Sequence, residues 1–188
     1  GQRTPTAQWT VTGSGAALVC SKGDGPVVEA ATVGTIVDLG ITDANNMGAA
    51  MAPAAADTLL SLFRDTQTGP ADYDAIVTGD LGQVGHDLLM QLMREQRMPL
   101  IDEQYHDCGL LIFDREQQDV HAGGSGCGCS AAVLNGYFLP KLQSGELGRI
   151  IFMATGALMS TTSSQQGETI PGVAHAVVLE SPQRGKKE

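Results

Sequence analysis

The sequence GGSGCGCSAAVLNGYFLPKLQSGELGRIIFMA, residues 123–154, decides the fold of this chain. It opens with a glycine-rich turn, continues into a predicted helix over residues 130–142, and ends in an apolar strand at Arg149–Ala154. The helix is predicted because its apolar residues fall on one stripe, and Pro140 places a boundary near its end. A glycine turn that opens a helix and leads into a buried strand is typical of α/β proteins.

Strands and helices alternate on both sides of this stretch. Upstream, the pattern predicts a helix with Pro53 in its first turn, a strand at Tyr73–Thr78, a helix at His86–Arg97 and a strand at Gly109–Phe113. Downstream, the last strand is predicted at Val173–Glu180. The alternation predicts an α/β fold, a three-layer α/β/α sandwich around a mixed, mostly parallel sheet. The last two strands are predicted to be antiparallel.

The first fifty residues are predicted to be strands and loops. Residues 1–8 form an irregular arm, and Trp9–Cys20 is a strand bent at its glycines. The turn Ser21–Pro26 joins it to a second strand at Val27–Asp38, so these two strands are expected to form a hairpin. Gly40–Ala52 is expected to be a loop.

Composition and charge exclude several classes of protein. The 188 residues suffice for one domain with its own core, and the formal net charge of -10 argues against a nucleic-acid partner. The same charge weakens any case for attachment to anionic lipid. No apolar run reaches the roughly 18 residues of a membrane span. Because residues Gln2 to Thr4 lead into a polar segment, no signal peptide is expected.

The four cysteines predict a reduced compartment, because the chain is too long and they are too few for a secreted disulfide framework. Cys127 and Cys129 form a CxC pair, for which packing beside a pocket is favoured over a disulfide or redox pair. The run His106–Cys108 is not expected to bind metal, because consecutive ligands rarely converge on one ion. No metal and no cofactor are predicted.

A faint internal repeat points to a duplicated fold. Thr12–Val19 reads TGSGAALV and Ile170–Leu179 reads IPGVAHAVVL, and both place glycine ahead of an apolar strand. With the glycine turn, this resembles the thiolase superfamily, in which two βαβαβαββ halves pack about a pseudo-two-fold axis. The resemblance implies that residues 1–26 are an arm and the closing strand of a missing amino-terminal half. Residues 27–188 are then the carboxy-terminal thiolase-like domain.

Four stretches resemble the stage V sporulation protein AD family. They are PTAQWTVTGSGAALV (Pro5–Val19), DLGITDANNMGAAMAPAA (Asp38–Ala55), SGCGCSA (Ser125–Ala131) and ATGALMSTTSSQQGETIPGVAHAVVLE (Ala154–Glu180). The resemblance implies binding of dipicolinic acid, for its uptake into the forespore and its release at germination. It also implies membrane-protein partners encoded in the same operon and a peripheral place at the spore inner membrane.

The resemblance also bears on catalysis. Acyl-condensing members of the superfamily pair a cysteine nucleophile from the first half with two residues from the second half. One of these is a histidine, and the other is a histidine or an asparagine. At those places this chain has Gly79 and Asp80, and then Gly128 and Cys129. The expectation is therefore that the chain is not an enzyme. Two alternatives stay open: a thiolase-like acyltransferase or 3-ketoacyl synthase, and a structural scaffold for a membrane transport complex.

The glycine turn is the predicted ligand site, because a helix start presents unpaired N–H groups to a carboxylate. The alternative is that its glycines serve only close packing of helix on sheet. The predicted ligand-binding residues are Gly126, Gly128, Cys129, Ser130, Val133, Gly156 and Gly167. Because the face toward the other half would otherwise be exposed, the isolated chain is expected to form a homodimer with residues 126–134 near the interface.

Overall fold

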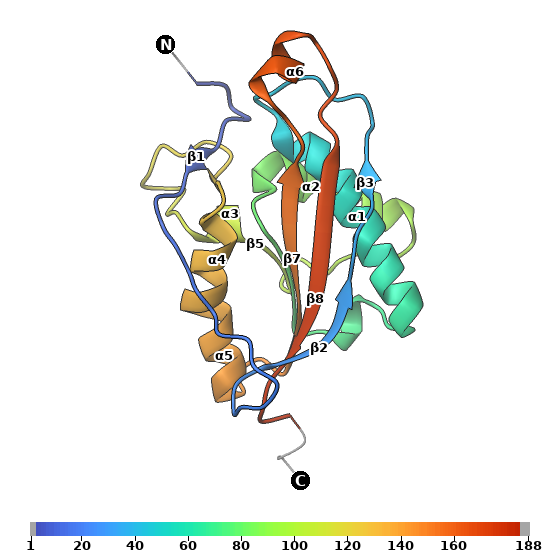
Figure 1. The fold of residues 1–188 in the computed structure, drawn as a ribbon, viewed down its shortest axis with the longest axis vertical. Coiled ribbons are helices and arrows are strands. Elements are labelled where there is room, and N and C mark those ends of the chain that lie inside the picture. Colours follow the sequence, from blue (N-terminus) through green and yellow to red (C-terminus); the bar gives the residue numbers. More distant parts are fainter. Residues whose placement is uncertain (1–2, 185–188) are drawn as a thin grey trace.

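A six-stranded sheet forms the centre of the computed structural model, which describes residues 3–184 (Figure 1). Its strands lie in the order β2 (Val27–Thr32), β8 (Gly172–Glu180), β7 (Arg149–Ala157), β4 (Ala75–Thr78) and β5 (Tyr105–Asp107), with β3 (Ile36–Val37) also paired to β8. β4 runs parallel to β5 and β7, whereas β8 is antiparallel to β2, β3 and β7. The sheet is therefore mixed, with β8 reversed among strands that share one direction.

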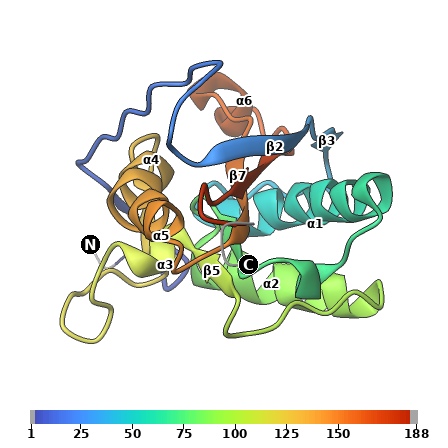
Figure 2. The same ribbon diagram turned by 90° about the horizontal axis from the view of Figure 1, so that it is seen from below.

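Helices cover both faces of this sheet (Figure 2). On one face lie α1 (Met47–Thr66) and α2 (Gly82–Glu95). On the other face, α4 (Cys129–Val133), the π-helical turn η2 (Leu134–Phe138) and α5 (Leu139–Ser144) follow one another directly. The short elements are η1 (Pro70–Asp72), α3 (Cys108–Leu111), α6 (Thr161–Gln165) and the strands β1 (Trp9–Thr10) and β6 (Gly124–Ser125). The main elements from β2 onward follow the order βαβαβαββ, so the predicted three-layer α/β/α arrangement around a mixed sheet is confirmed.

Alternating side chains of the strands build a separate core on each face of the sheet. Ile151 and Met153 of β7 pack in the cluster that faces α1 and α2. Ile150 and Phe152 belong to the cluster that faces α4 and α5. Since successive side chains of a strand point to opposite faces, the continuous apolar run of β7 is what a strand covered on both sides requires.

The first helix begins earlier than the sequence pattern predicts. Residues up to Ala52 were expected to be a loop, but α1 starts at Met47, and the Asn46 side chain accepts a hydrogen bond from the amide of Ala49 at 3.4 Å. Pro53 therefore lies inside the helix and not in its first turn. Capping by Asn46 and burial of Met51 and its neighbours stabilise the turns that precede the proline. Likewise, α2 begins at Gly82, four residues before the predicted start at His86.

The strand predicted at Gly109–Phe113 is wrong. The strand β5 ends at Asp107, and the apolar run that follows begins as the short helix α3. A short apolar run does not distinguish a strand from a buried helical turn, which explains the error. Gly109 also faces the backbone of the glycine turn, because a Cβ atom there would lie 2.3 Å from the carbonyl oxygen of Gly124.

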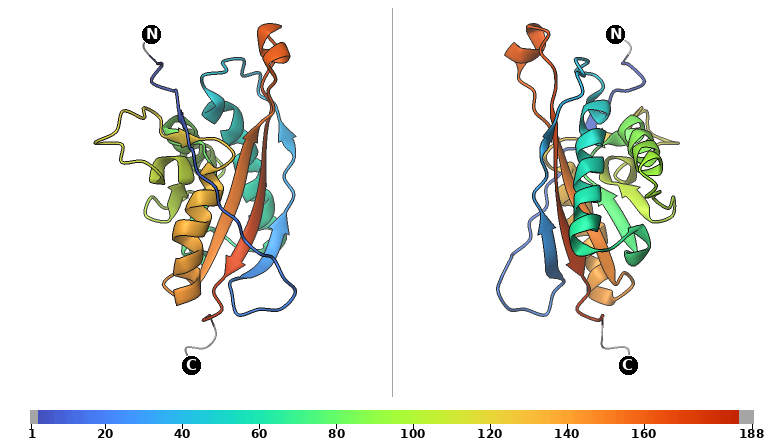
Figure 3. Two further views of the ribbon diagram at one scale, coloured as in Figure 1. Left: turned by 60° about the vertical axis from the view of Figure 1, so that its left-hand side comes forward. Right: turned by 90° about the vertical axis from the view of Figure 1, so that its right-hand side faces the viewer.

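The hairpin predicted for the amino-terminal segment is also wrong. β1 pairs in parallel with β6, and β2 pairs with β8 instead of with the preceding segment. Residues 11–26 contain no strand and run past the α4–α5 helix before turning into β2 (Figure 3). The physical reason is close packing: a Cβ atom at Gly15 would lie 2.2 Å from the carbonyl oxygen of Ala131 in α4.

Close packing of α1 on α2 gives the first testable prediction. A Cβ atom at Gly48 would lie 2.4 Å from the carbonyl oxygen of Leu81 and 2.8 Å from the amide of Gly85. We expect Gly48→Ala to lower the free energy of unfolding by about 1–3 kcal/mol, because the helices must separate to admit the methyl group. Urea unfolding of the chain measures the change.

The matched control is Gly69→Ala. A Cβ atom at Gly69 would have no neighbour within 4 Å, and its φ of -139° suits any residue. We expect its free energy of unfolding to change by no more than about 1 kcal/mol. Equal stability of the two variants would contradict the close α1–α2 contact.

Candidate functional site

The connections that leave β4 and β5 diverge at the carboxyl ends of these strands. From β4 the chain enters α2 on one face of the sheet, and from β5 it passes through α3 to α4 on the other face. Adjacent parallel strands whose connections diverge in this way leave a crevice outside their carboxyl ends, where α/β proteins bind ligands. The residues directly after β4 and at the end of β5 are therefore the place to look for a site.

Asp107 is the last residue of β5 and is 1% exposed. Its carboxylate accepts hydrogen bonds from Thr78 Oγ1 at 2.6 Å, the amide of Leu81 at 2.8 Å and the amide of Gly82 at 3.1 Å. Burial raises the pKa of Asp107, and these three hydrogen bonds act in the opposite direction. The carboxylate thereby fixes the end of β4 and the start of α2 against β5.

Asp80 lies just beyond β4 and connects three segments of the chain. Its Oδ2 accepts a hydrogen bond from the amide of Gly126 at 2.9 Å, and its Oδ1 accepts one from Thr155 Oγ1 at 3.1 Å. The Asp80 amide in turn donates to Thr155 Oγ1 at 3.2 Å. Burial raises the pKa of Asp80, while the hydrogen bonds from Gly126 and Thr155 lower it. The glycine turn, β4 and β7 therefore meet at this carboxylate.

The amino-terminal arm closes one side of the same site. Gln8 Nε2 donates to the carbonyl oxygens of Asp80 at 3.0 Å and Gly124 at 2.8 Å. Backbone hydrogen bonds from Trp9 to Gly123 and from Ala122 to Ala7, at 2.8 and 3.0 Å, hold the arm beside the turn. The arm is thus a wall of the site and not a separate extension.

The two buried cysteines line the site as neutral thiols. Cys129 Sγ lies 3.9 Å from the carbonyl oxygen of Gly79, to which it donates, and Cys108 is fully buried in α3. Burial raises the pKa of Cys129 to about 12 and that of Cys108 well above its usual range. Cys127 is exposed, and all four cysteines are free, so Cys127 and Cys129 form no disulfide here. Buried thiols of this kind pack as small hydrophobic groups.

The structure brings most of the predicted ligand-binding residues to one place. The turn residues Gly126, Gly128, Cys129, Ser130 and Val133 lie together at β6 and α4. Gly156 follows Thr155 in β7. The Asp80 carboxylate bonds to both Thr155 and Gly126, and it therefore links β7 to the glycine turn. Gly167 lies apart: it follows α6, which stands at the tip of the β7–β8 connection (Figure 1). Its φ of +75° and the hydrogen bond from its amide to the carbonyl oxygen of Ser164 end that helix.

The space for a ligand carboxylate at the start of α4 is smaller than the sequence pattern predicts. A Cβ atom at Gly128 would lie 1.9 Å from the carbonyl oxygen of Gly13, because the arm crosses directly over this residue. The amide of Gly126 is bonded to Asp80, and the amide of Cys129 donates to the carbonyl of Gly126 at 3.0 Å. A side chain at position 128 would therefore displace the arm, so a Gly128 variant is not a clean test of ligand binding.

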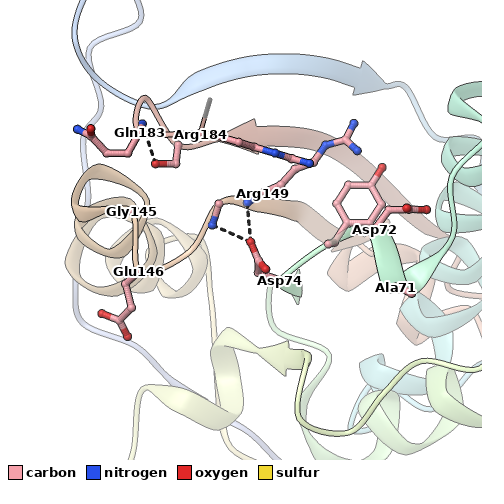
Figure 4. Close-up of a pocket in the computed structure, with 11 residues that line it drawn as sticks. Ala71, Asp72, Asp74, Gly145, Glu146, Arg149, Gln183 and Arg184 are labelled. Atoms are coloured by element: carbon pink, nitrogen blue, oxygen red, sulfur yellow. Dashed lines mark hydrogen bonds between the residues drawn. The ribbon is translucent and has the colours of Figure 1, made fainter. Parts of the chain in front are cut away.

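A separate cavity of about 640 Å3 lies at the opposite end of the sheet, near the start of β7 (Figure 4). Asp74 Oδ2 accepts hydrogen bonds there from the amides of Gly148 and Arg149 at 2.7 and 2.9 Å. The Arg149 guanidinium forms two hydrogen bonds of 2.7 Å with Glu29 and lies 4.8 Å from the centre of the Tyr73 ring. Because these charges are already paired, the cavity resembles a structural ion-pair network more than a site for an ionic ligand.

Two further observations concern residues 3–184. No three histidine, cysteine, aspartate or glutamate side chains within this range are grouped so that they could hold a metal ion. None of the helices in the described range combines the length and the apolar composition needed to cross a bilayer.

The fold and the site together define a class: a βαβαβαββ half-fold whose site holds two carboxylates and two neutral thiols at the carboxyl ends of its strands. The sequence matches the family described as Stage V sporulation protein AD (SpoVAD) over residues 1–180. It is 48% identical over 180 residues to Stage V sporulation protein AD of Bacillus subtilis (strain 168). The chain belongs to this family.

The match covers 96% of this chain and 53% of the Bacillus subtilis protein, so the chain spans about half the length of that relative. Among solved structures, it is similar to MvaS in complex with 3-hydroxy-3-methylglutaryl coenzyme A, with a TM-score of 0.45 and 14% identity over 84% of this chain and 40% of the other. It is also similar to the ketosynthase ApeO in complex with its chain length factor ApeC from Xenorhabdus doucetiae. There the TM-score is 0.42 and the identity 11%, over 84% and 79% of the two chains.

The state of the thiols gives the second prediction. We expect Cys20 and Cys127, which are exposed, to react rapidly with a chromogenic disulfide at pH 8. Cys108 and Cys129 should react only after unfolding, because burial blocks access and the raised pKa leaves almost no thiolate. A Cys127→Ser variant should lose one rapid equivalent and no slow one. Rapid reaction of a third thiol would mean that the glycine turn opens in solution.

Proposed function

We propose that this chain is the carboxy-terminal half of a non-catalytic protein that binds dipicolinic acid, for its uptake into the forespore and its release at germination. Membership of the stage V sporulation protein AD family supports the sporulation role. The observation that carries the proposal is the meeting of the Gly126 turn, Asp80 and the Thr155–Gly156 end of β7 outside the carboxyl ends of the strands. We also propose that the protein is peripheral to the spore inner membrane, beside membrane proteins encoded in its operon.

The face of the sheet on which a ligand would lie follows from the alternation along β7. Phe152 packs on the side that carries α4, so Gly156, four residues later, lies on that same side. A Cβ atom at Gly156 would meet its nearest neighbour, Val173 Cγ1, at 3.5 Å, so space remains beside this residue. A small planar ligand between Gly156 and the start of α4 would contact backbone and the Cys127–Cys129 segment.

Several features favour binding over acyl transfer. Gly79 and Asp80 stand where the resemblance places a histidine donor. Glycine has no side-chain donor, and an ionised carboxylate only accepts hydrogen bonds, so neither residue replaces that histidine in an oxyanion hole. The Cys129 thiol donates to Gly79 and is neutral. His86 stacks on Tyr105 with ring centres 4.4 Å apart, and His106 packs 6.0 Å from Phe138, so both histidines are engaged elsewhere.

The third prediction tests the ligand site in the complete parent protein. We expect Gly156→Leu to fill the space beside α4 and to weaken dipicolinate binding at least tenfold, since one lost charge-assisted contact costs about 1.5–3 kcal/mol. Isothermal titration calorimetry measures the affinity.

The matched control is Gly69→Leu, at the opposite end of the sheet, where a Cβ atom would have no neighbour within 4 Å. It should bind as the unaltered protein does. Unchanged affinity in a folded Gly156→Leu protein would remove this site, and an unaltered protein that binds no dipicolinate would favour the scaffold alternative.

The fourth prediction concerns the isolated half. Leu18 and Val19 of the arm are 94% and 82% exposed, and Val27 and Val28 of β2 are about half exposed, at 53% and 50%. We propose that two copies cover such apolar surface by forming a homodimer, with residues 126–134 near the interface. Sedimentation at micromolar concentration should give the mass of a dimer, and a monomer under those conditions would contradict the proposal.

A further inference from the structure

Three groups near Asp80 are themselves acidic. Asp107 at the end of β5, Cys108 of α3 and Cys129 of α4 each feel the charge of Asp80. Thr155 of β7 and Gln8 of the arm, which also contact Asp80, are uncharged. The charges that act most strongly on Asp107, Cys108 and Cys129 come from Asp80 and from one another.

An anion bound in the proposed site would lie against the Asp80 carboxylate. The Asp80 carboxylate stands between the two segments that bound the site, bonded to the amide of Gly126 on one side and to Thr155 Oγ1 on the other. A dicarboxylate between these segments would place a second carboxylate beside the first in a partly buried setting. Two such groups so close do not both stay ionised, because one of them binds a proton.

We infer that Asp80 takes up one proton from solvent when a dicarboxylate binds at the glycine turn, so that ligand binding is proton-linked. This inference rests on the proposed function. No covalent bond changes other than that to the proton: the neutral Asp80 hydroxyl donates to a ligand carboxylate oxygen, and the pair shares one negative charge. The stable form of the ligand complex is therefore the one in which Asp80 carries a proton.

Asp80 is the proton acceptor, and not Asp107, for geometric reasons. Asp107 is 1% exposed, and its carboxylate already receives three donors from β4 and the start of α2. Asp80 is only partly buried, and each of its oxygens receives one donor. Each oxygen of its carboxylate therefore keeps a lone pair that can bind a proton.

The test is calorimetric titration of the complete parent protein with dipicolinate in two buffers of different ionisation enthalpy. We expect uptake of one proton per ligand bound above the pKa of Asp80, and affinity that falls about tenfold for each pH unit above that pKa. Below it the proton is already bound and this dependence disappears. In Asp80→Asn, whose amide still accepts from Gly126 and bonds to Thr155, we expect no proton uptake and an affinity independent of pH in the same range.

A second variant checks that Asp80 is the group observed. Thr155→Val removes a hydroxyl that stabilises the ionised carboxylate, so the pH at which affinity begins to fall should move upward while one proton is still taken up. Binding without proton uptake, or equal uptake in Asp80→Asn, would overturn the inference and leave the proposed function standing. Absence of binding at every pH would overturn both.

Discussion

The buried carboxylate of Asp107 determines how the strands and the second helix meet. It accepts one hydrogen bond from the Thr78 side chain and two from the backbone at Leu81 and Gly82, so β4, β5 and α2 converge on a single side chain. Since α2 has no side-chain cap of its own at Leu81, this carboxylate supplies the acceptors that the helix start needs. The direction of the chain after β4, and with it the place of Asp80, depends on these bonds.

Much of the architecture could be predicted because its cause is local. β7 and β8 are apolar on both faces, and the second half of α1 carries apolar residues at helical spacing. The secondary structure of each segment can therefore be predicted from its own residues. The arm could not be predicted in this way. Trp9–Val19 has the composition of a strand, but whether it forms a ladder depends on which strands are available, and Gly15 instead allows it to pass close to α4. Likewise, GLLIF at 109–113 has an apolar pattern that fits both a strand and a helical turn.

The site was only partly visible in the sequence for a related reason. The glycine turn is contiguous, so its residues could be named together, and Asp80 was noticed because it replaces an expected donor. Thr155 and Gln8 come from distant segments, and polar residues of these types are common, so nothing local marked them. One signal was available for Asp107: it ends a strand beside β4, and Asp80 comes two residues after β4 ends, so the two acidic side chains lie at neighbouring strand ends.

The arm also makes the site sensitive to mechanical load. Residues 7–11 are bonded to residues 122–125 through the backbone and through Gln8, whereas residues 11–26 have no strand of their own. Tension applied to the chain upstream of residue 7 would therefore fall first on this short ladder, and from there on the glycine turn and Asp80. A force on any segment joined to the amino-terminal end would thus reach the glycine turn through the hydrogen bonds of the arm, and not through the hydrophobic core.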